Sequence, residues 1–168
     1  MINRKGGIKL KFVLREATLD DYEKIKPIHK EVHDLHVSGR PDRYNVTEHT
    51  LDMSYYEGLI MNDDARVFVI DLNDEIIAFT FLRKNETPDR ETIVKKEYVF
   101  IEDFGVTEKY KEKGLGKQLF TKAVEFTKDT GAESLELGVW EFNNTAIQFY
   151  EAMGMKTQAR KMEIKVDG

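Results

Sequence analysis

The pattern of hydrophobic and polar positions predicts that strands and helices alternate along the chain. Residues 11–17 (KFVLREA) fit a short strand, and Thr18 with Asp21 three residues later is typical of a helix start. Apolar residues at helical spacing carry this helix to about Gly39 and indicate a second helix over 47–61. The side chains expected to face inward are Ile25, Ile28, Val32, Leu35, Leu51, Tyr55, Leu59 and Met61.

The middle of the chain is rich in strand-forming residues. The runs 66–72 and 75–82 are joined by Asn73-Asp74, which predicts a hairpin. A polar loop is expected over 83–96, and the longest strand over 97–106 (EYVFIEDFGV).

The last third returns to helical spacing. It predicts a helix over 115–130 that Gly131 ends, a strand over 134–140, a helix over 143–153 and a closing strand over 161–166 (KMEIKV).

This order of elements, β-α-α-β-β-β-α-β-α-β, predicts an α/β fold with one mixed sheet and about four flanking helices. Short hairpin links imply an antiparallel first half, and the strand-helix-strand segment after residue 97 implies a parallel crossover. A ligand cleft is expected where the two halves meet. We expect a short basic tail over 1–10 and a single domain over 11–168, since no repeat or composition break divides the chain.

Composition excludes several functional classes. A net charge of −5 without a Lys- or Arg-rich patch argues against nucleic acid as a partner. No apolar run of 18 residues and no signal peptide is present, which predicts a cytoplasmic protein without a membrane partner. The absence of cysteine excludes disulfides and a cysteinyl acyl-enzyme.

The glycine-rich segment KYKEKGLGKQLF follows the longest strand directly. A nucleotide-triphosphate loop would need glycine where Lys111 stands and Ser or Thr where Gln118 stands, and a dinucleotide fingerprint would need glycine at Leu119. There remains a loop with Gly114 and Gly116 that opens a helix, whose exposed N–H groups favour anions. A simple flexible turn is the alternative.

Two separated motifs resemble the GNAT superfamily of N-acetyltransferases. VTEKYKEKGLGKQLF is similar to the family's acetyl-coenzyme A pyrophosphate loop, with Lys111 where the pattern has Arg or Gln. NNTAIQFYEAMGM resembles the second signature, in which Asn143, Ala146 and Tyr150 match by position and Met155 replaces an aromatic residue. The expected strand and helix order also fits the family.

The resemblance implies direct transfer of an acetyl group in a ternary complex, with acetyl-coenzyme A as cosubstrate and no metal. It implies that Tyr150 protonates the leaving thiolate, although a core aromatic is the alternative. Family members are often dimers, so a homodimer is a further expectation. The expected coenzyme contacts are Phe104, Gly105, Val106, Lys111, Glu112, Lys113, Gly114, Leu115, Gly116, Lys117, Asn143, Ala146 and Phe149.

Glu102 is the candidate catalytic base. An alkylamine with a pKa of about 10.4 is only about 0.04% neutral at pH 7, so a proton acceptor is needed. Glu102 lies at even spacing with Tyr98, Phe100 and Phe104, which predicts a carboxylate on an otherwise apolar strand face. A structural role for Glu102 is the alternative, and a bulge would break the spacing.

Three histidines, His29, His33 and His36, are spaced as on one helix. The segment HKEVH lacks the HExxH arrangement of a zinc protease, so we expect a solvated or helix-flanking cluster and no metal. In the resembled family the following segment, DLHVSGRPDRY, shapes the acceptor pocket, and a polar turn is the alternative. The candidate contacts to a small-molecule or peptide amine are His36, Arg40, Asp42 and Tyr44.

The leading hypothesis is therefore an acetyl-coenzyme A-dependent N-acetyltransferase. A coenzyme-binding regulatory or sensor module without turnover is the main alternative, and an interaction domain with a plain glycine turn is the third.

Overall fold

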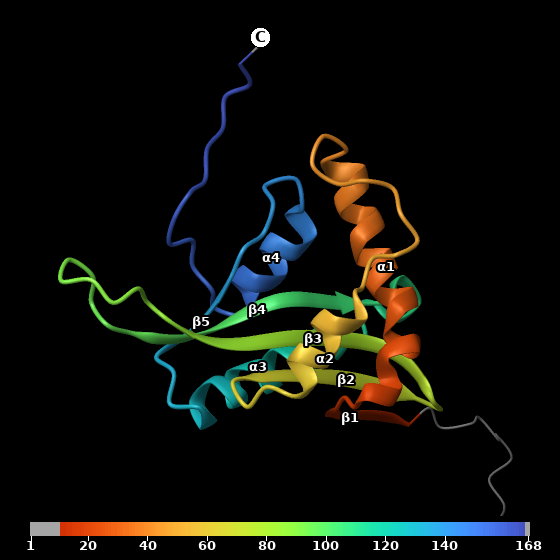
Figure 1. The fold of residues 1–168 in the computed structure, drawn as a ribbon. Coiled ribbons are helices and arrows are strands. Elements are labelled where there is room, and N and C mark those ends of the chain that lie inside the picture. The colour runs from red at the N-terminus through yellow and green to blue at the C-terminus, as the bar shows by residue number, and fades with distance from the viewer. Residues whose placement is uncertain (1–10, 167–168) are drawn as a thin grey trace, which may run out of the picture. The chain divides into compact units, whose positions relative to one another are not determined.

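The computed structural model describes residues 11–166, and the expected tail over 1–10 lies outside the described residues. The chain divides after Gly138 into two compact units, each of which is described by itself. The first unit contains one five-stranded sheet with the strand order β1-β2-β3-β4-β5 (Figure 1). Its elements are β1 (Phe12–Glu16), α1 (Tyr22–Gly39), α2 (Met53–Ile60), β2 (Ala65–Leu72), β3 (Glu75–Glu86), β4 (Glu97–Val106), α3 (Leu115–Asp129) and β5 (Ser134–Leu137).

Strands β1 to β4 are antiparallel to their neighbours, and β5 pairs with β4 in parallel through the α3 crossover. The fold is therefore the predicted mixed α/β sheet. Helices α1 and α2 cover one face and α3 covers the other, as the alternation in β2 demonstrates. Val67 and Val69 pack with α1 and α2, whereas Phe68 between them contacts the ring of Phe126 on α3.

Local signals in the sequence produce the expected turns. The Asp21 carboxylate accepts a hydrogen bond from the Thr18 backbone N–H at 2.8 Å, at the start of a short 3-10 turn that leads into α1. Asn73 and Asp74 have φ values of 51° and 72°, the left-handed pair that a two-residue hairpin turn requires. Both predictions are confirmed.

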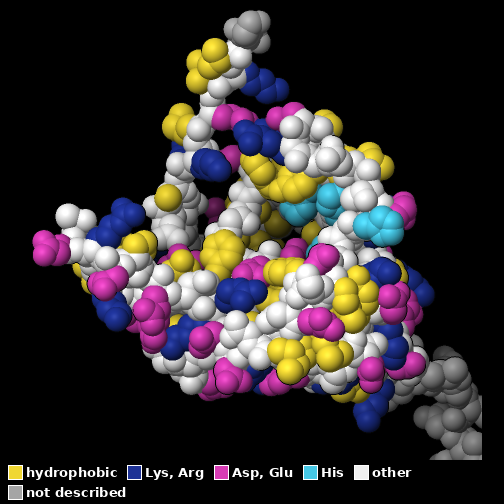
Figure 2. All heavy atoms as spheres, viewed as in Figure 1, with side chains coloured by type: hydrophobic (Ala, Val, Ile, Leu, Met, Phe, Trp, Pro, Cys, Tyr) yellow, Lys and Arg dark blue, Asp and Glu magenta, His cyan; other side chains and the backbone are white. Residues whose placement is uncertain are grey.

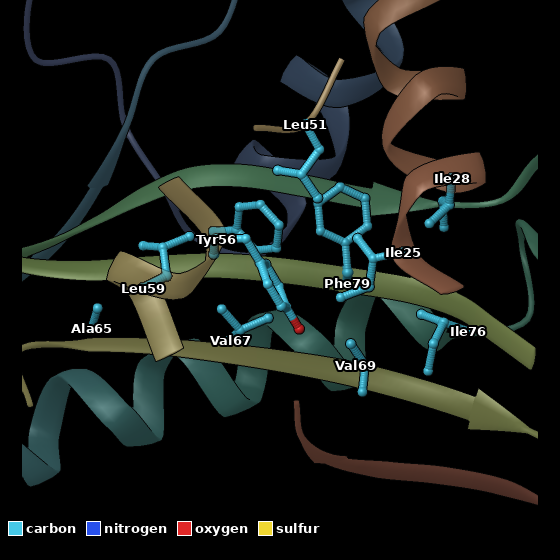
Figure 3. Packing of buried hydrophobic residues seen from close by; sticks show 11 residues of the cluster. Ile25, Ile28, Leu51, Tyr56, Leu59, Ala65, Val67, Val69, Ile76 and Phe79 are labelled. Carbon is cyan, nitrogen blue, oxygen red and sulfur yellow. The ribbon is translucent and has the colours of Figure 1, made fainter. Parts of the chain in front are cut away.

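The hydrophobic core between the sheet and helices α1 and α2 is formed by apolar side chains together with Tyr56, whose hydroxyl donates to the Thr18 carbonyl oxygen (Figure 3). Ile25 of α1, Tyr56 and Leu59 of α2, and Phe79 and Phe81 of β3 have no exposed surface. Burying such side chains contributes about 1.5–3 kcal/mol each, so this core fixes α1 and α2 firmly on the sheet.

Helix α2 begins later than predicted. It starts at Met53 because the Asp52 carboxylate accepts from the Tyr55 backbone N–H at 2.9 Å and so caps the helix. Leu51 is buried ahead of the helix, whereas Met61 is 76% exposed just after its end. Leu35, in the second half of α1, is also exposed, so the inward positions predicted for Leu35 and Met61 are wrong.

Two strand lengths differ from prediction. Strand β3 continues to Glu86 because it keeps pairing with β4 as far as Glu97, so the expected loop at 83 begins later. Strand β5 ends at Leu137 instead of residue 140, since its last partner on β4 is Ile101.

The second unit contains helix α4 (Asn144–Ala152) and an extended segment. Asn143 caps α4 by accepting from the Ala146 backbone N–H, and Gly154 has a φ of 93° after the helix end. The closing strand predicted over 161–166 is wrong, because these residues pair with no described strand, and Met162, Ile164 and Val166 are at least 85% exposed. Alternation gives a strand only when a neighbouring strand completes its hydrogen bonds.

Within the described part of the chain, no helix combines the length and the apolar character that crossing a membrane would require.

Candidate functional site

Strands β4 and β5 pair along only the first half of β4. Their parallel pairing ends at Ile101, whereas β4 continues to Val106 in register with β3. The residues predicted to contact coenzyme through their backbone, Phe104, Gly105 and Val106, lie in this continuation. An extended ligand could form hydrogen bonds with the backbone groups along such a strand edge.

Glu102 lies at a bulge in β4, on the face covered by α1 and α2. The β3–β4 register shifts between Phe81, which pairs with Asp103, and the next residue of β3, which pairs with Ile101, so Glu102 is an extra residue. Glu102 lies on the same face of the sheet as Phe100, whose partner on β3 is Arg83. The predicted alignment with Phe104 is wrong, because Phe104 pairs with Thr80 on the opposite face.

The Glu102 carboxylate is held by two hydrogen bonds. Its Oε1 accepts from Arg83 Nε at 2.6 Å, and its Oε2 accepts from the Tyr55 hydroxyl at 2.5 Å. Burial raises the pKa of the Tyr55 hydroxyl well above its usual range, and the bond to Glu102 raises it further, so Tyr55 keeps its proton and remains a donor. The Glu102 side chain is 23% exposed, so solvent still reaches the carboxylate.

The same bulge brings Asp103 to the face covered by α1. The alternation of side chains along the sequence predicts the other face for this residue. Asp103 Oδ2 lies 3.6 Å from His29 Nε2, and the other ring nitrogen of His29 lies 3.0 Å from Thr50 Oγ1. His29 is buried against the rings of Phe79 and Phe81, so the expectation of a solvated histidine is wrong for His29. Tyr55, Arg83 and Asp103 were all missed, because hydrophobic periodicity gives neither the position of α2, nor the β3–β4 register, nor the bulge.

The glycine loop that was predicted to bind an anion leads into the N-terminus of α3. Gly114 is the N-cap residue with a φ of 77°, a left-handed conformation that side chains disfavour. The N–H groups of the first residues of α3, Leu115, Gly116 and Lys117, have no intrahelical acceptor, and no side chain among residues 11–166 caps them. A cavity of about 340 Å³ adjoins Gly114 and Lys117 on the β1 side of α3. These features fit a bound phosphate or pyrophosphate.

The lysine side chains of this loop are at the surface. Lys111 Nζ pairs with Glu108, and Lys111, Glu112, Lys113 and Lys117 are exposed. Glu112 adopts a φ of 60°, so the loop carries a second left-handed position beside Gly114. The loop therefore combines backbone donors with surface lysines, of which Lys111 is paired with Glu108.

The candidate acceptor residues gather around the end of α1, where Figure 2 shows histidine side chains at the surface. The His36 ring stacks on Tyr44 at 5.2 Å, and burial lowers the pKa of His36. Arg40 donates from Nε and Nη2 to the two oxygens of Asp42, each at 2.9 Å. His33 Nε2 lies 2.7 Å from the carbonyl oxygen of Asn45. These contacts fold the segment after α1 back onto the helix.

No metal site accompanies these histidines in the part of the chain that the structure describes: it holds no group of three or more His, Asp or Glu side chains able to bind a metal ion.

The second unit holds the remaining candidates on α4. Asn143 Oδ1 accepts from the Ala146 N–H at 3.2 Å, so its carbonyl oxygen serves the helix cap. Tyr150 contacts the ring of Phe149 edge to face at 5.3 Å and is partly buried. Ala146, Phe149 and Tyr150 thus belong to one short helix, which Asn143 starts.

Comparison with known proteins gives consistent matches. The profile of the Acetyltransferase (GNAT) family matches residues 29–155. The chain is 28% identical over 115 residues to an uncharacterized N-acetyltransferase of Methanocaldococcus jannaschii, MJ1207, which covers 68% of this chain and 50% of that protein. It is 34% identical over 96 residues to the L-ornithine N5-acetyltransferase NATA1 of Arabidopsis thaliana, which covers 56% of this chain and 41% of that protein.

A solved structure extends the similarity to nearly the whole chain. A mutant of the BH1408 protein of Bacillus halodurans superposes with a TM-score of 0.88 and 31% identity, over 92% of this chain and 99% of that one. The chain spans about half the length of the curated relatives first matched by sequence.

Proposed function

Because the chain belongs to the GNAT family of acetyltransferases, we propose that it transfers an acetyl group from acetyl-coenzyme A to a primary amine of a small molecule or peptide. The observation that carries the proposal is the course of β4. The strand continues past its last pairing with β5 and leads into a loop whose Gly114 opens the N-terminus of α3. An extended backbone edge followed by an anion site matches the extended arm and pyrophosphate of coenzyme A.

Acetyl-coenzyme A supplies an acyl group activated as a thioester. The neutral amine nitrogen attacks the carbonyl carbon, a C–N bond forms, the C–S bond breaks, and the sulfur accepts a proton. Glu102 takes the proton that the amine loses, directly or through water. Arg83 and Tyr55 orient this carboxylate from two sides. Tyr150 is proposed as the proton donor to the sulfur, on the basis of the matching second motif.

The acceptor is proposed to be small and to carry a primary amine. The relative NATA1 is named for L-ornithine, whose side-chain amine belongs to this class. The cluster of His36, Arg40, Asp42 and Tyr44 is proposed as one wall of the acceptor pocket. These side chains contact one another, His36 with Tyr44 and Arg40 with Asp42, and would therefore form a fixed wall.

A free-thiol release assay with acetyl-coenzyme A and a panel of amines tests the proposal. We expect thiol release to depend on the amine and on its neutral fraction, with N-acetylated product identified by mass spectrometry. Thermal stabilisation by coenzyme A without thiol release from any amine would favour the sensor alternative. Absence of both would favour an interaction domain.

The proton-donor role is tested with Tyr150→Phe. We expect this change to lower kcat by about 10²-fold or more with little change in coenzyme affinity, because the proposed coenzyme contacts are mostly backbone groups. Phe149→Leu removes the ring next to Tyr150 but no hydroxyl, and serves as the packing control. Equal turnover in Tyr150→Phe and the parent would remove Tyr150 from this role.

A further inference from the structure

Arg83 presents an open guanidinium group beside the candidate base. Its Nε donates to Glu102, but within residues 11–166 neither Nη1 nor Nη2 donates a hydrogen bond. No buried side-chain nitrogen or oxygen of the described residues lacks a partner, so these two groups face solvent. The side chain is 27% exposed. Two parallel N–H donors of Arg83 are therefore available to a ligand.

Two other arginines of the first unit, Arg15 and Arg40, use terminal nitrogens to bind carboxylates. Arg15 donates from Nη1 and Nη2 to Asp21 and from Nη2 also to Asp71. Arg40 lies side-on against both oxygens of Asp42. Arg83 differs because its one carboxylate partner is bound through Nε, which leaves the planar end of the guanidinium group unused.

Aromatic side chains share the sheet face around Arg83. Phe100 is directly opposite Arg83 in the register, and Tyr98 is opposite Asn85 one step further along the same face. All four side chains are partly buried. Glu102 and Tyr55 lie on the other side of the guanidinium group. The face thus combines a cation and a carboxylate with aromatic neighbours.

We propose that Arg83 binds a carboxylate of the acceptor, so that the acceptor is an amino acid whose amine lies by Glu102. This inference rests on the proposed acetyltransfer. Two parallel N–H groups match the two oxygens of a carboxylate, a geometry that a lysine cannot reproduce. Glu102 remains available to the amine, because each carboxylate oxygen has a second lone pair besides the one used by Arg83 or Tyr55.

Matched acceptors that differ only by the carboxylate test this proposal. L-ornithine is compared with 1,4-diaminobutane, and L-lysine with 1,5-diaminopentane, by kcat/KM from thiol release. Hydrogen bonds to charged groups contribute about 1.5–3 kcal/mol, so we expect roughly a 10- to 100-fold preference for the amino acid of each pair. Arg83→Met should abolish this preference, and Arg83→Lys should keep part of it.

Lys84→Met is the matched control. Lys84 is the next residue of β3, so it faces the opposite side of the sheet, where its Nζ lies 3.0 Å from Glu97. The variant loses the same charge as Arg83→Met and should keep the parental preference. Equal kcat/KM within each pair for the parent, or a preference that survives in Arg83→Met, would overturn the proposal.

Binding measurements separate this proposal from the proposed function. If no amine supports thiol release, acetyltransfer fails, and thermal shifts with the same acceptor pairs in the presence of coenzyme A still test the carboxylate site. Because Arg83→Met leaves the Glu102 charge without its cation, the double variant Arg83→Met/Glu102→Gln is measured as well. A larger shift with ornithine than with diaminobutane, lost in the double variant, supports the site; equal shifts in the parent refute it.

Discussion

The two parts of the candidate site in the first unit are built from different groups. Around Glu102, the proposed chemistry depends on side chains, since Tyr55 and Arg83 come from α2 and β3 and meet at one carboxylate. Around Gly114, the proposed anion binding depends on backbone N–H groups, and the Lys111 side chain is paired with Glu108. Conservative side-chain changes should therefore damage the first part severely and the second only where they alter the path of the backbone.

The largest effect is expected at the carboxylate. Glu102→Gln keeps the size of the side chain and removes its ability to accept a proton, so kcat should fall by about 10²- to 10⁴-fold while coenzyme affinity is nearly unchanged. Steady-state kinetics with coenzyme binding measured separately checks this. Glu97→Gln, on the same strand but paired with Lys84, is the control and should retain activity. Full activity of Glu102→Gln would leave Glu102 with a structural role only.

Gly105 lies on the chain between Glu102 and Gly114, and a side chain at this position is expected to lower the stability of the fold. A Cβ at this position would lie 2.7 Å from Val32 Cγ2 and 2.8 Å from Phe79 Cε1, so α1 packs directly on the strand. Gly105→Ala should lower the free energy of unfolding by about 1–3 kcal/mol through overpacking. Denaturant unfolding of the variant and the parent measures this difference in the free energy of unfolding.

Gly58→Ala is the matched control for Gly105→Ala. Gly58 lies inside α2, and nothing is within 4 Å of an added Cβ. Because alanine favours helix over glycine, this change should raise stability by about 0.5–1 kcal/mol. Equal stabilities of the two variants would contradict the close packing of α1 on Gly105.

The backbone loop should respond to a change at Gly114. Its φ of 77° costs a side-chain-bearing residue about 1–2 kcal/mol, so Gly114→Val should distort the loop and weaken coenzyme binding by roughly tenfold. Gly131, at the other end of α3, has a φ of 73° and is the control. Gly131→Val should lose similar stability without losing coenzyme affinity, as calorimetry can determine. Unchanged affinity in Gly114→Val would refute the anion loop.

The sequence allowed much of this fold to be predicted, because its strongest signals are local. Thr18 with Asp21, Asn73 with Asp74, and Gly131 are each read from a few neighbouring residues, and each forms the expected turn or cap. Segment 161–166 has equally clear alternation but forms no strand, since pairing depends on a partner that local pattern does not specify. Local chemistry is thus predictable where the hydrogen-bond partner lies within the same turn.

The site was predictable only in part for the same reason. Glu102 was found by its charge on an apolar strand, and its correct face followed from Tyr98 and Phe100. Its partners were not found, because Tyr55 is 47 residues away in sequence and the bulge that brings Asp103 to the same face has no sequence signature. Side-chain networks between distant elements need the register of the sheet, which hydrophobic periodicity does not give.

The smallest effect is expected at Lys111, where the family pattern has Arg or Gln. Lys111 pairs with Glu108 three residues earlier, and both side chains are largely exposed, a type of ion pair that contributes at most about 1 kcal/mol. If the loop binds the pyrophosphate through backbone groups, Lys111→Ala should raise the KM for acetyl-coenzyme A less than about threefold. Lys111→Arg should then give no gain. A tenfold loss in Lys111→Ala, restored by Lys111→Arg, would instead show that the side chain leaves Glu108 and binds the phosphate, and the contrast between the two parts of the site would no longer hold.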